Sequence, residues 1–126
     1  MAGLTLDTGA LIAFERTDRR IMAQLKEAAQ RGDELTVPTV VVAEAWRGGS
    51  RSARVSSLLE ACAIEPLFED LARVAGEALA AIKGSAAIDA IVMASAAGRG
   101  DRVITSDFDD LDRLRGYFPS VRLSRI

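Results

Sequence analysis

The chain has 126 residues, of which 49% are hydrophobic and 27% charged, and its formal net charge is −2. This size and composition predict one globular domain over residues 1–126, and they exclude a disordered chain or one with an apolar run of about 18 residues that could span a bilayer. The absence of histidine excludes Ser/His and Cys/His catalytic pairs, and the single cysteine, Cys62, excludes an internal disulfide or a thiolate zinc site.

The N-terminus lacks the basic start, long apolar stretch and small-residue cleavage site of a secretory signal. With a lone cysteine, which suits a reducing compartment, this predicts a cytoplasmic protein with no membrane partner. The apolar surroundings of Cys62 in "LLEACAIEPL" indicate a core side chain rather than a reactive thiol.

The first third of the chain predicts a strand, two helices and a second strand. The strand "LTL" ends at Asp7, and Thr8 and Gly9 can turn the chain into a helix over "ALIAFER". A second helix is expected from Asp18, a favourable N-cap, to Gly32, because its apolar residues recur every three or four positions. "ELTVP" is expected to be a short buried strand.

In the middle third, "TVVVAEAWR" has a β-branched run that is typical of a strand, but the preceding Pro38 and the alanines favour a helix. "SARVSSLLEAC" is expected to continue as helix, and "AIEPL" to be a strand ended by Pro66. An amphipathic helix follows over "FEDLARVAGEALAAIKG", closed by Gly84.

The last third predicts a buried helix over "AIDAIVMASAAGRG", which is apolar nearly all round, and a strand over "RVITSD". "FDDLDRLRGYF" is expected to be a helix and "SVRLSRI" a final strand or a tail. Helices alternate with short apolar strands without a hairpin signal, which predicts an α/β fold around a mainly parallel sheet.

Four acidic residues interrupt the four most apolar segments of the chain: Asp7, Glu44, Asp89 and Asp107. Each has a simple structural explanation, since aspartates cap helices or accept turn hydrogen bonds and Glu44 could point to solvent. Together they favour a different interpretation, because ligands of parallel sheets bind at the carboxyl ends of the strands. Converging carboxylates without histidine suit a hard cation such as Mg²⁺ or Mn²⁺.

The segment "TSDFDDLD" contains further acids. Asp110 lies three residues after Asp107, one helical turn away, and is a candidate fifth acid of the same site. Asp112 is expected to pair with Arg113 or Arg115, or to remain solvated.

The segments "TLDTGALIAFE", "VPTVVVAEAWRG", "AAIDAIVMASAA" and "VITSDFDDLDRL" resemble, in order and spacing, the acidic motifs of PIN-domain ribonucleases. The closest likeness is to VapC-type toxins of bacterial toxin–antitoxin pairs. The resemblance implies a three-layer α/β/α sandwich and a metal-dependent endoribonuclease with an RNA substrate. It also implies a cognate antitoxin as protein partner and a homodimer.

The resemblance places Asp7, Glu44, Asp89 and Asp107 around Mg²⁺ or Mn²⁺ as metal ligands and catalytic residues. Thr105 and Ser106 match the hydroxyl pair that precedes the last acid of the family. The implied chemistry is hydrolysis of an RNA phosphodiester by water that the metal activates, leaving 5′-phosphate and 3′-hydroxyl ends. One position departs from the pattern: many relatives carry an acid where this chain has Ala86.

Cations must offset the repulsion between these acids and RNA. The candidates are arginines that follow the first two motifs, and their alternatives are a solvated face or an antitoxin contact. Trp46 could stack on a base, but its apolar neighbours favour core packing. The candidate arginines are Arg16, Arg19, Arg20, Arg47, Arg51 and Arg54.

Other classes of protein also combine an α/β fold with an acidic Mg²⁺ site. A signalling receiver domain would need an acidic pair after its first strand and a late lysine, but Thr8 follows Asp7 and the only lysines are Lys26 and Lys83. A haloacid-dehalogenase-type phosphatase would need a second aspartate where Gly9 stands. A degenerate PIN fold that only binds a partner is the remaining alternative, which Ala86 keeps open.

Overall fold

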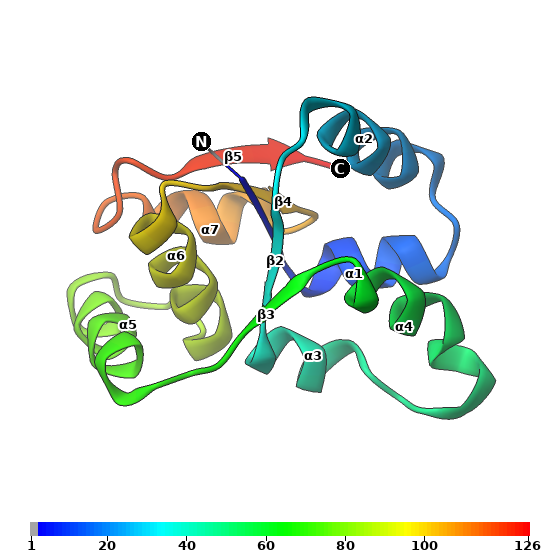
Figure 1. The fold of residues 1–126 in the computed structure, drawn as a ribbon. Helices are drawn as coiled ribbons and strands as arrows, with labels where there is room; N and C mark the ends of the chain where they lie inside the picture. Colours follow the sequence, from blue (N-terminus) through cyan, green and yellow to red (C-terminus); the bar gives the residue numbers. More distant parts are fainter. Residues whose placement is uncertain (1–2) are drawn as a thin grey trace.

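A computed structural model describes residues 3–126, in which helices cover both faces of a β-sheet (Figure 1). All strand pairs are parallel, as the sequence predicts, and the final segment forms a strand rather than a tail. The strands are β1 (Leu4–Leu6), β2 (Leu35–Pro38), β3 (Ala63–Glu65), β4 (Arg102–Thr105) and β5 (Arg122–Arg125).

The helices occupy the segments between these strands, so strand and helix alternate along the chain. Within residues 3–126 no helix is long and apolar enough to cross a membrane. The helices are α1 (Thr8–Glu15), α2 (Arg19–Arg31), α3 (Thr39–Ala45), a 3₁₀ turn η1 (Gly49–Ser52), α4 (Ala53–Glu60), α5 (Glu69–Ala81), α6 (Ala87–Arg99) and α7 (Phe108–Leu114).

The strand order is β3-β2-β1-β4-β5, which places β1 in the centre of the sheet between β2 and β4. This order differs from the 2-1-3-4-5 order of receiver domains, which excludes that alternative. In Figure 1 α1, α2 and α4 lie on one side of the sheet and α5, α6 and α7 on the other. The architecture is therefore the expected α/β/α sandwich.

Two helix ends follow local chemistry as predicted, while other elements end earlier than expected, among them α7, which ends at Leu114 rather than Phe118. Asp18 caps α2 by accepting a hydrogen bond from the Arg20 amide, and Gly32 ends α2 in the left-handed region at φ 75°. The segment after α3 does not continue directly as helix, because the chain leaves helical geometry at Trp46 and Gly48 adopts φ 78°. The helix α5 ends at Ala81, before the expected Gly84.

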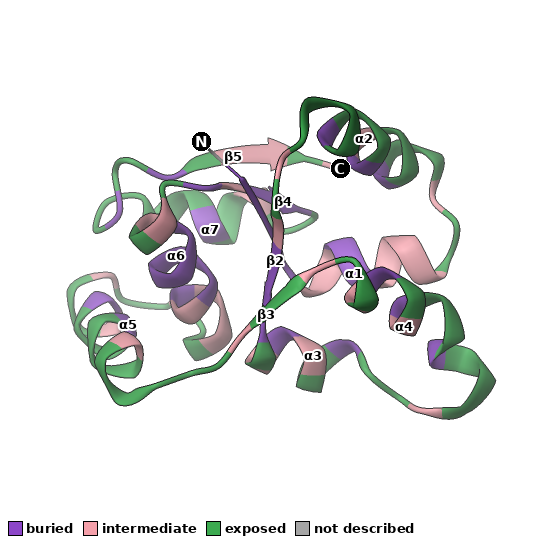
Figure 2. Ribbon diagram, in the orientation of Figure 1, coloured by how far each residue is buried: buried purple, intermediate pink, exposed green. Residues whose placement is uncertain are grey.

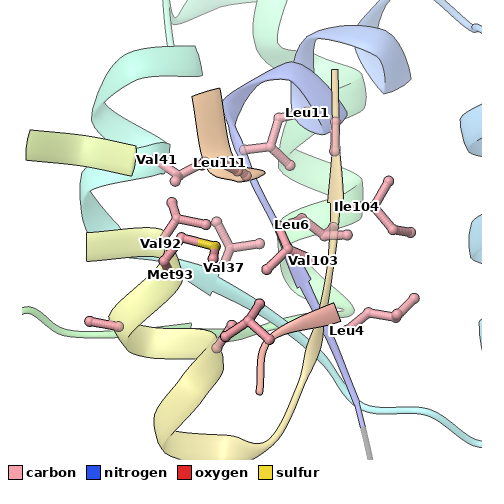
Figure 3. Close-up of a cluster of buried hydrophobic side chains, with 14 of the residues drawn as sticks. Leu4, Leu6, Leu11, Val37, Val41, Val92, Met93, Val103, Ile104 and Leu111 are labelled. Carbon is pink, nitrogen blue, oxygen red and sulfur yellow. The ribbon is translucent and has the colours of Figure 1, made fainter. Parts of the chain in front are cut away.

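The core is centred on β1 and β4, which are buried along most of their length (Figure 2). Leu6 and Ile104 are fully buried and lie near Leu11 of α1, while Val92 and Met93 of α6 pack on the other side (Figure 3). Burying each such side chain stabilises the fold by about 1.5–3 kcal/mol. The predicted burial of α6 is confirmed by its six buried residues.

Cys62 also follows its prediction. It is half-buried and packs against the core, and burial raises the pKa of its thiol to about 11. Such a thiol remains protonated at neutral pH and is a poor nucleophile.

A buried ionic network joins the end of α6 to the sheet, which the sequence did not predict. Asp101 is only 5% exposed and accepts hydrogen bonds from the Gly3 amide, the Thr5 hydroxyl and Arg99 Nε. Arg99 also pairs with Glu65 of β3 and donates to the Thr5 hydroxyl. One guanidinium therefore links α6, β1, β3 and the start of β4.

We expect Arg99→Met to lower the free energy of unfolding by about 3 kcal/mol, because it leaves the buried Asp101 carboxylate without its cation. The matched control is Arg73→Met on α5. Arg73 also pairs with a carboxylate, that of Glu69, but both side chains are about three-quarters exposed, and its loss should cost less than about 0.5 kcal/mol. Urea unfolding measures both, and equal effects would show that the Arg99 network adds no stability.

Candidate functional site

The four predicted acids gather near the edge where the parallel strands end. Asp7 follows β1 and Asp107 follows β4, and these two strands are neighbours. Glu44 lies near the end of α3, which packs against α1 and α6. Asp89 lies in the first turn of α6. Four segments that are distant in the sequence therefore bring one acid each to this region.

Asp7 is the most buried of the four, with 5% of its surface exposed. Its carboxylate caps α1 by accepting a hydrogen bond of 3.0 Å from the Ala10 amide, which confirms the simple turn interpretation. Burial nevertheless raises its pKa to about 6, and the charges of Asp107 and Asp89 add to the rise. Hydrogen bonds from Thr105 and Ala10 only partly oppose it.

Asp89 shows the same perturbation. Burial is the main cause that raises its pKa to about 6. The charges of Asp107, Asp110 and Glu44 raise it further, and Arg113 opposes them. Each predicted acid therefore takes part in at least one repulsion with another of them.

The other two acids, Glu44 and Asp107, are exposed. Glu44 Oε1 accepts a hydrogen bond of 2.5 Å from the Thr8 hydroxyl, so it does not simply point to solvent. Asp107 occupies the N-cap position of α7, but its side chain makes no capping bond. The N-cap alternative for Asp89 is wrong, because Ala86 occupies that position of α6.

The candidate fifth acid, Asp110, lies in the first turn of α7 and pairs with Arg113 at 3.0 Å. Its charge reaches Asp89, as described above, while its membership of a metal site stays a prediction. Asp112 pairs with Arg115 at 3.1 Å, as predicted.

The hydroxyl pair before Asp107 connects the loops after β1 and β4. Thr105 Oγ1 accepts a hydrogen bond of 2.8 Å from the Asp107 amide. Ser106 packs directly on Gly9 of α1, since a Cβ atom at Gly9 would lie 1.8 Å from Ser106 Oγ and 2.8 Å from its Cβ. Only glycine permits this approach of the first turn of α1 to the segment after β4.

The carboxylates do not form a closed cage in this structure. Among residues 3–126, no three or more His, Cys, Asp or Glu side chains are grouped so that they could hold a metal ion. The site is therefore an open group of carboxylates, in which Asp7 is buried, Asp89 is half-buried, and Glu44 and Asp107 are exposed.

A cavity of about 510 Å³ opens beside the acids, between α1 and β5. Thr105, Ser106 and Gly9 line the end that borders the site. The other walls carry three arginines, and we call this cavity the arginine groove. Its remaining lining residues are Ile12, Ala13, Arg16, Asp18, Arg20, Arg125 and Ile126.

The arginines predicted to offset the acids separate into two groups. Arg16 and Arg20 line the arginine groove, and Arg20 is paired with Asp18 at 2.9 Å. Two of those after the second motif have local contacts: Arg47 donates to the Trp46 carbonyl and Arg54 lies over the Phe14 ring.

Two features of this region were not predicted from the sequence. Arg125 lines the arginine groove because β5 pairs with β4, and only that register could have revealed it. Trp46 is 42% exposed, so the expected core packing is wrong. It follows the end of α3 and lies with Leu59 of α4 on a surface groove.

The comparison with protein families matches the PIN domain family to residues 4–117. No curated protein matches the chain.

Solved structures share the fold at low identity. One is a chain of VapBC2 from Rickettsia felis, in a complex bound to a DNA fragment from the VapBC2 promoter. It has a TM-score of 0.79 at 13% identity, with 98% of each chain covered. A toxin–antitoxin complex from Klebsiella pneumoniae gives 0.76 at 20% identity, covering 94% of this chain and 95% of that one. FitAcB from Neisseria gonorrhoeae gives 0.70 at 20% identity, with 95% of each covered.

We expect Asp7→Asn to stabilise the metal-free protein at about pH 7.5 by about 2 kcal/mol, because it removes a desolvated charge. The folded pKa of Asp7, about 6, exceeds the ordinary value of 3.8. The wild-type contribution is thus fully present below pH 3.8 and is lost as the pH rises through 6. The gain of the variant should shrink toward zero at about pH 4.

Unfolding in urea with EDTA present, measured across this pH range, gives the difference between variant and wild type. Asp112→Asn is the control, since Asp112 is 48% exposed in its pair with Arg115 and should show no such gain. A gain for Asp7→Asn that is constant with pH would contradict the raised pKa.

We expect Gly9→Ala to lower the free energy of unfolding by about 1–3 kcal/mol, because the new methyl group overlaps Ser106. The double variant Gly9→Ala/Ser106→Gly should recover most of this loss. Thermal unfolding of the single and double variants measures the coupling, and additive effects would show that the contact between Gly9 and Ser106 is unimportant.

Proposed function

The chain belongs to the PIN domain family, and we propose that it is a divalent-metal-dependent endoribonuclease that hydrolyses RNA phosphodiesters. One observation carries the proposal: Asp7 is buried among like charges and has no ion-pair partner among residues 3–126. A desolvated carboxylate with acidic neighbours is costly to ionise unless a cation joins it. The fold therefore maintains an arrangement whose stability is improved by a bound cation.

The residues present fit Mg²⁺ or Mn²⁺ in their donor chemistry, since every candidate ligand supplies carboxylate oxygen. Asp7 and Asp89 would be the principal ligands, because burial fixes them and raises the pKa of both. Glu44 and Asp107 would complete the shell or bind through water, and both are exposed to solvent. Asp110 is the proposed fifth member.

When bound, the cation would lower the pKa of a water toward neutrality and offset the charge of the phosphate. The residues of the chain prepare the site for it. The Ala10 amide and the Thr105 hydroxyl orient the Asp7 carboxylate, and the Thr8 hydroxyl holds Glu44. The carboxylates at the edge of the site can accept the proton of the attacking water, which would hydrolyse the bond to 5′-phosphate and 3′-hydroxyl ends.

We place this enzyme in the cytoplasm as the toxin of a toxin–antitoxin pair, silenced by a cognate antitoxin and assembled as a homodimer. The support is the fold shared with chains of toxin–antitoxin complexes. A second candidate, a PIN fold that only binds its partner, is favoured by the lack of a preformed cage within residues 3–126 and by Ala86. The two candidates differ in catalysis and are separated by the following experiment.

We expect the wild-type protein to cut single-stranded RNA with Mg²⁺ or Mn²⁺ and to lose this activity in EDTA. Asp7→Asn should cut at least about 100-fold more slowly, because a ligand that fixes the cation becomes neutral. Asp112→Asn should retain activity, since Asp112 lies on the exposed face of α7. Gel analysis of the products, with circular dichroism to confirm folding, makes the measurement.

Equal cutting by wild type and Asp7→Asn, or activity that persists in EDTA, would overturn the proposed mechanism. A folded wild-type protein that binds Mn²⁺ but never cuts RNA would instead support the binding-only candidate.

A further inference from the structure

The arginine groove contains a guanidinium whose position is set by the sheet. Arg125 is the last residue of β5 and pairs in register with Thr105 of β4, two residues before Asp107. Its guanidinium stacks on the Phe108 ring at 4.0 Å from the ring centre. Its closest acid, Asp109, is 3.9 Å away and 97% exposed, so this ion pair is weak and easily displaced.

Arg16 supplies a second cation from the other wall. It is the C-cap of α1, it is exposed, and it forms no ion pair with any residue from 3 to 126. The third arginine, Arg20, is neutralised by Asp18, which also lines the groove. Within the described residues, one unpaired guanidinium, that of Arg16, and one held only by a weak ion pair, that of Arg125, therefore line one cavity.

The groove is continuous with the acidic site. Thr105 and Ser106 line it, and the Thr105 hydroxyl also contacts Asp7 and the Asp107 amide. An anion in the groove would thus lie beside the acids. A polyanionic strand needs cations at this position, because the acids repel every phosphate that approaches them.

We propose that Arg16 and Arg125 form a phosphate-binding subsite for the RNA strand next to the bond that is cut. Each guanidinium can grip a phosphate through two parallel hydrogen bonds, and Arg125 is pre-oriented for this by its stacking on Phe108. The inference rests on the proposed function for the identity of the strand. It adds a binding subsite and a path for the RNA strand, which would run from the acids along the arginine groove toward β5 and the end of α1.

The test measures binding separately from cutting. The Asp89→Asn background is used so that the RNA remains intact. The Kd for a labelled oligouridylate is measured by fluorescence anisotropy at salt concentrations from about 50 to 200 mM. Arg16→Gln and Arg125→Gln should each raise Kd about five-fold and reduce the slope of log Kd against log salt by about 1. Arg125→Lys keeps the charge and should recover most of the slope.

Arg73→Gln is the matched control, because Arg73 is an exposed arginine on α5, across the sheet from α1. It should leave both Kd and the salt slope unchanged. Thermal unfolding of each variant shows whether the loss of the Arg125 contact with Phe108 affects folding, and Arg16→Gln, whose side chain makes no such contact, gives an independent measurement.

Equal Kd values for Arg16→Gln, Arg125→Gln and Arg73→Gln would overturn the subsite, and so would the absence of RNA binding in every variant. Displacement of the RNA by polyglutamate at equal charge concentration would also overturn it, because the groove would then be a site for an acidic protein segment. If the arginine variants weaken binding as expected while the wild-type protein never cuts, the subsite stands and the proposed nuclease function fails.

Discussion

The burial of a carboxylate at the end of the central strand is the constraint on which the site depends. The strand order places β1 between β2 and β4, so Asp7 lies where the sheet is best covered by helices from both sides. Burying this carboxylate is unfavourable, and the hydrophobic core offsets the loss, because the apolar side chains of β1 and β4 are almost completely buried. A carboxylate at an edge strand would be hydrated, and its pKa would not be raised in this way.

Two aspartates with the same exposed fraction, 5%, show how burial can serve different ends. Asp101, at the start of β4, has a guanidinium partner and two further hydrogen bonds from β1 and the residue before it. Asp7, at the end of β1, has only an amide and a hydroxyl, and its charged neighbours are acids. The charge of Asp101 is therefore balanced within the chain, and its contacts stabilise the fold. Asp7 lacks a cationic partner within the described part of the chain, which is the feature on which the proposed metal site rests.

The sequence predicted the elements and the acidic positions because both leave local signals. Helical spacing, caps such as Asp18 and Gly32, and acids inside apolar segments can all be seen in a few adjacent residues. Contacts between distant segments left no such signal. Arg99 reaches Thr5 across 94 positions, so no local pattern in the sequence indicated the network around Asp101. Trp46 was misplaced because its neighbours are apolar, whereas its exposure depends on where α3 ends.

Ala86 shows how the fold and the charge of the site are linked. It occupies the N-cap of α6 with extended backbone and no capping side chain, the position at which an aspartate would satisfy free amides of the first turn. An acid there would stabilise the helix end, but it would also add negative charge three residues before Asp89, whose pKa three neighbouring acids already raise. With alanine, the first turn contains only Asp89 as its acid, so the partial positive charge of the helix N-terminus acts on a single carboxylate. The chain thus gives up a helix cap and avoids further repulsion at a site that already concentrates more negative charge than its own residues neutralise.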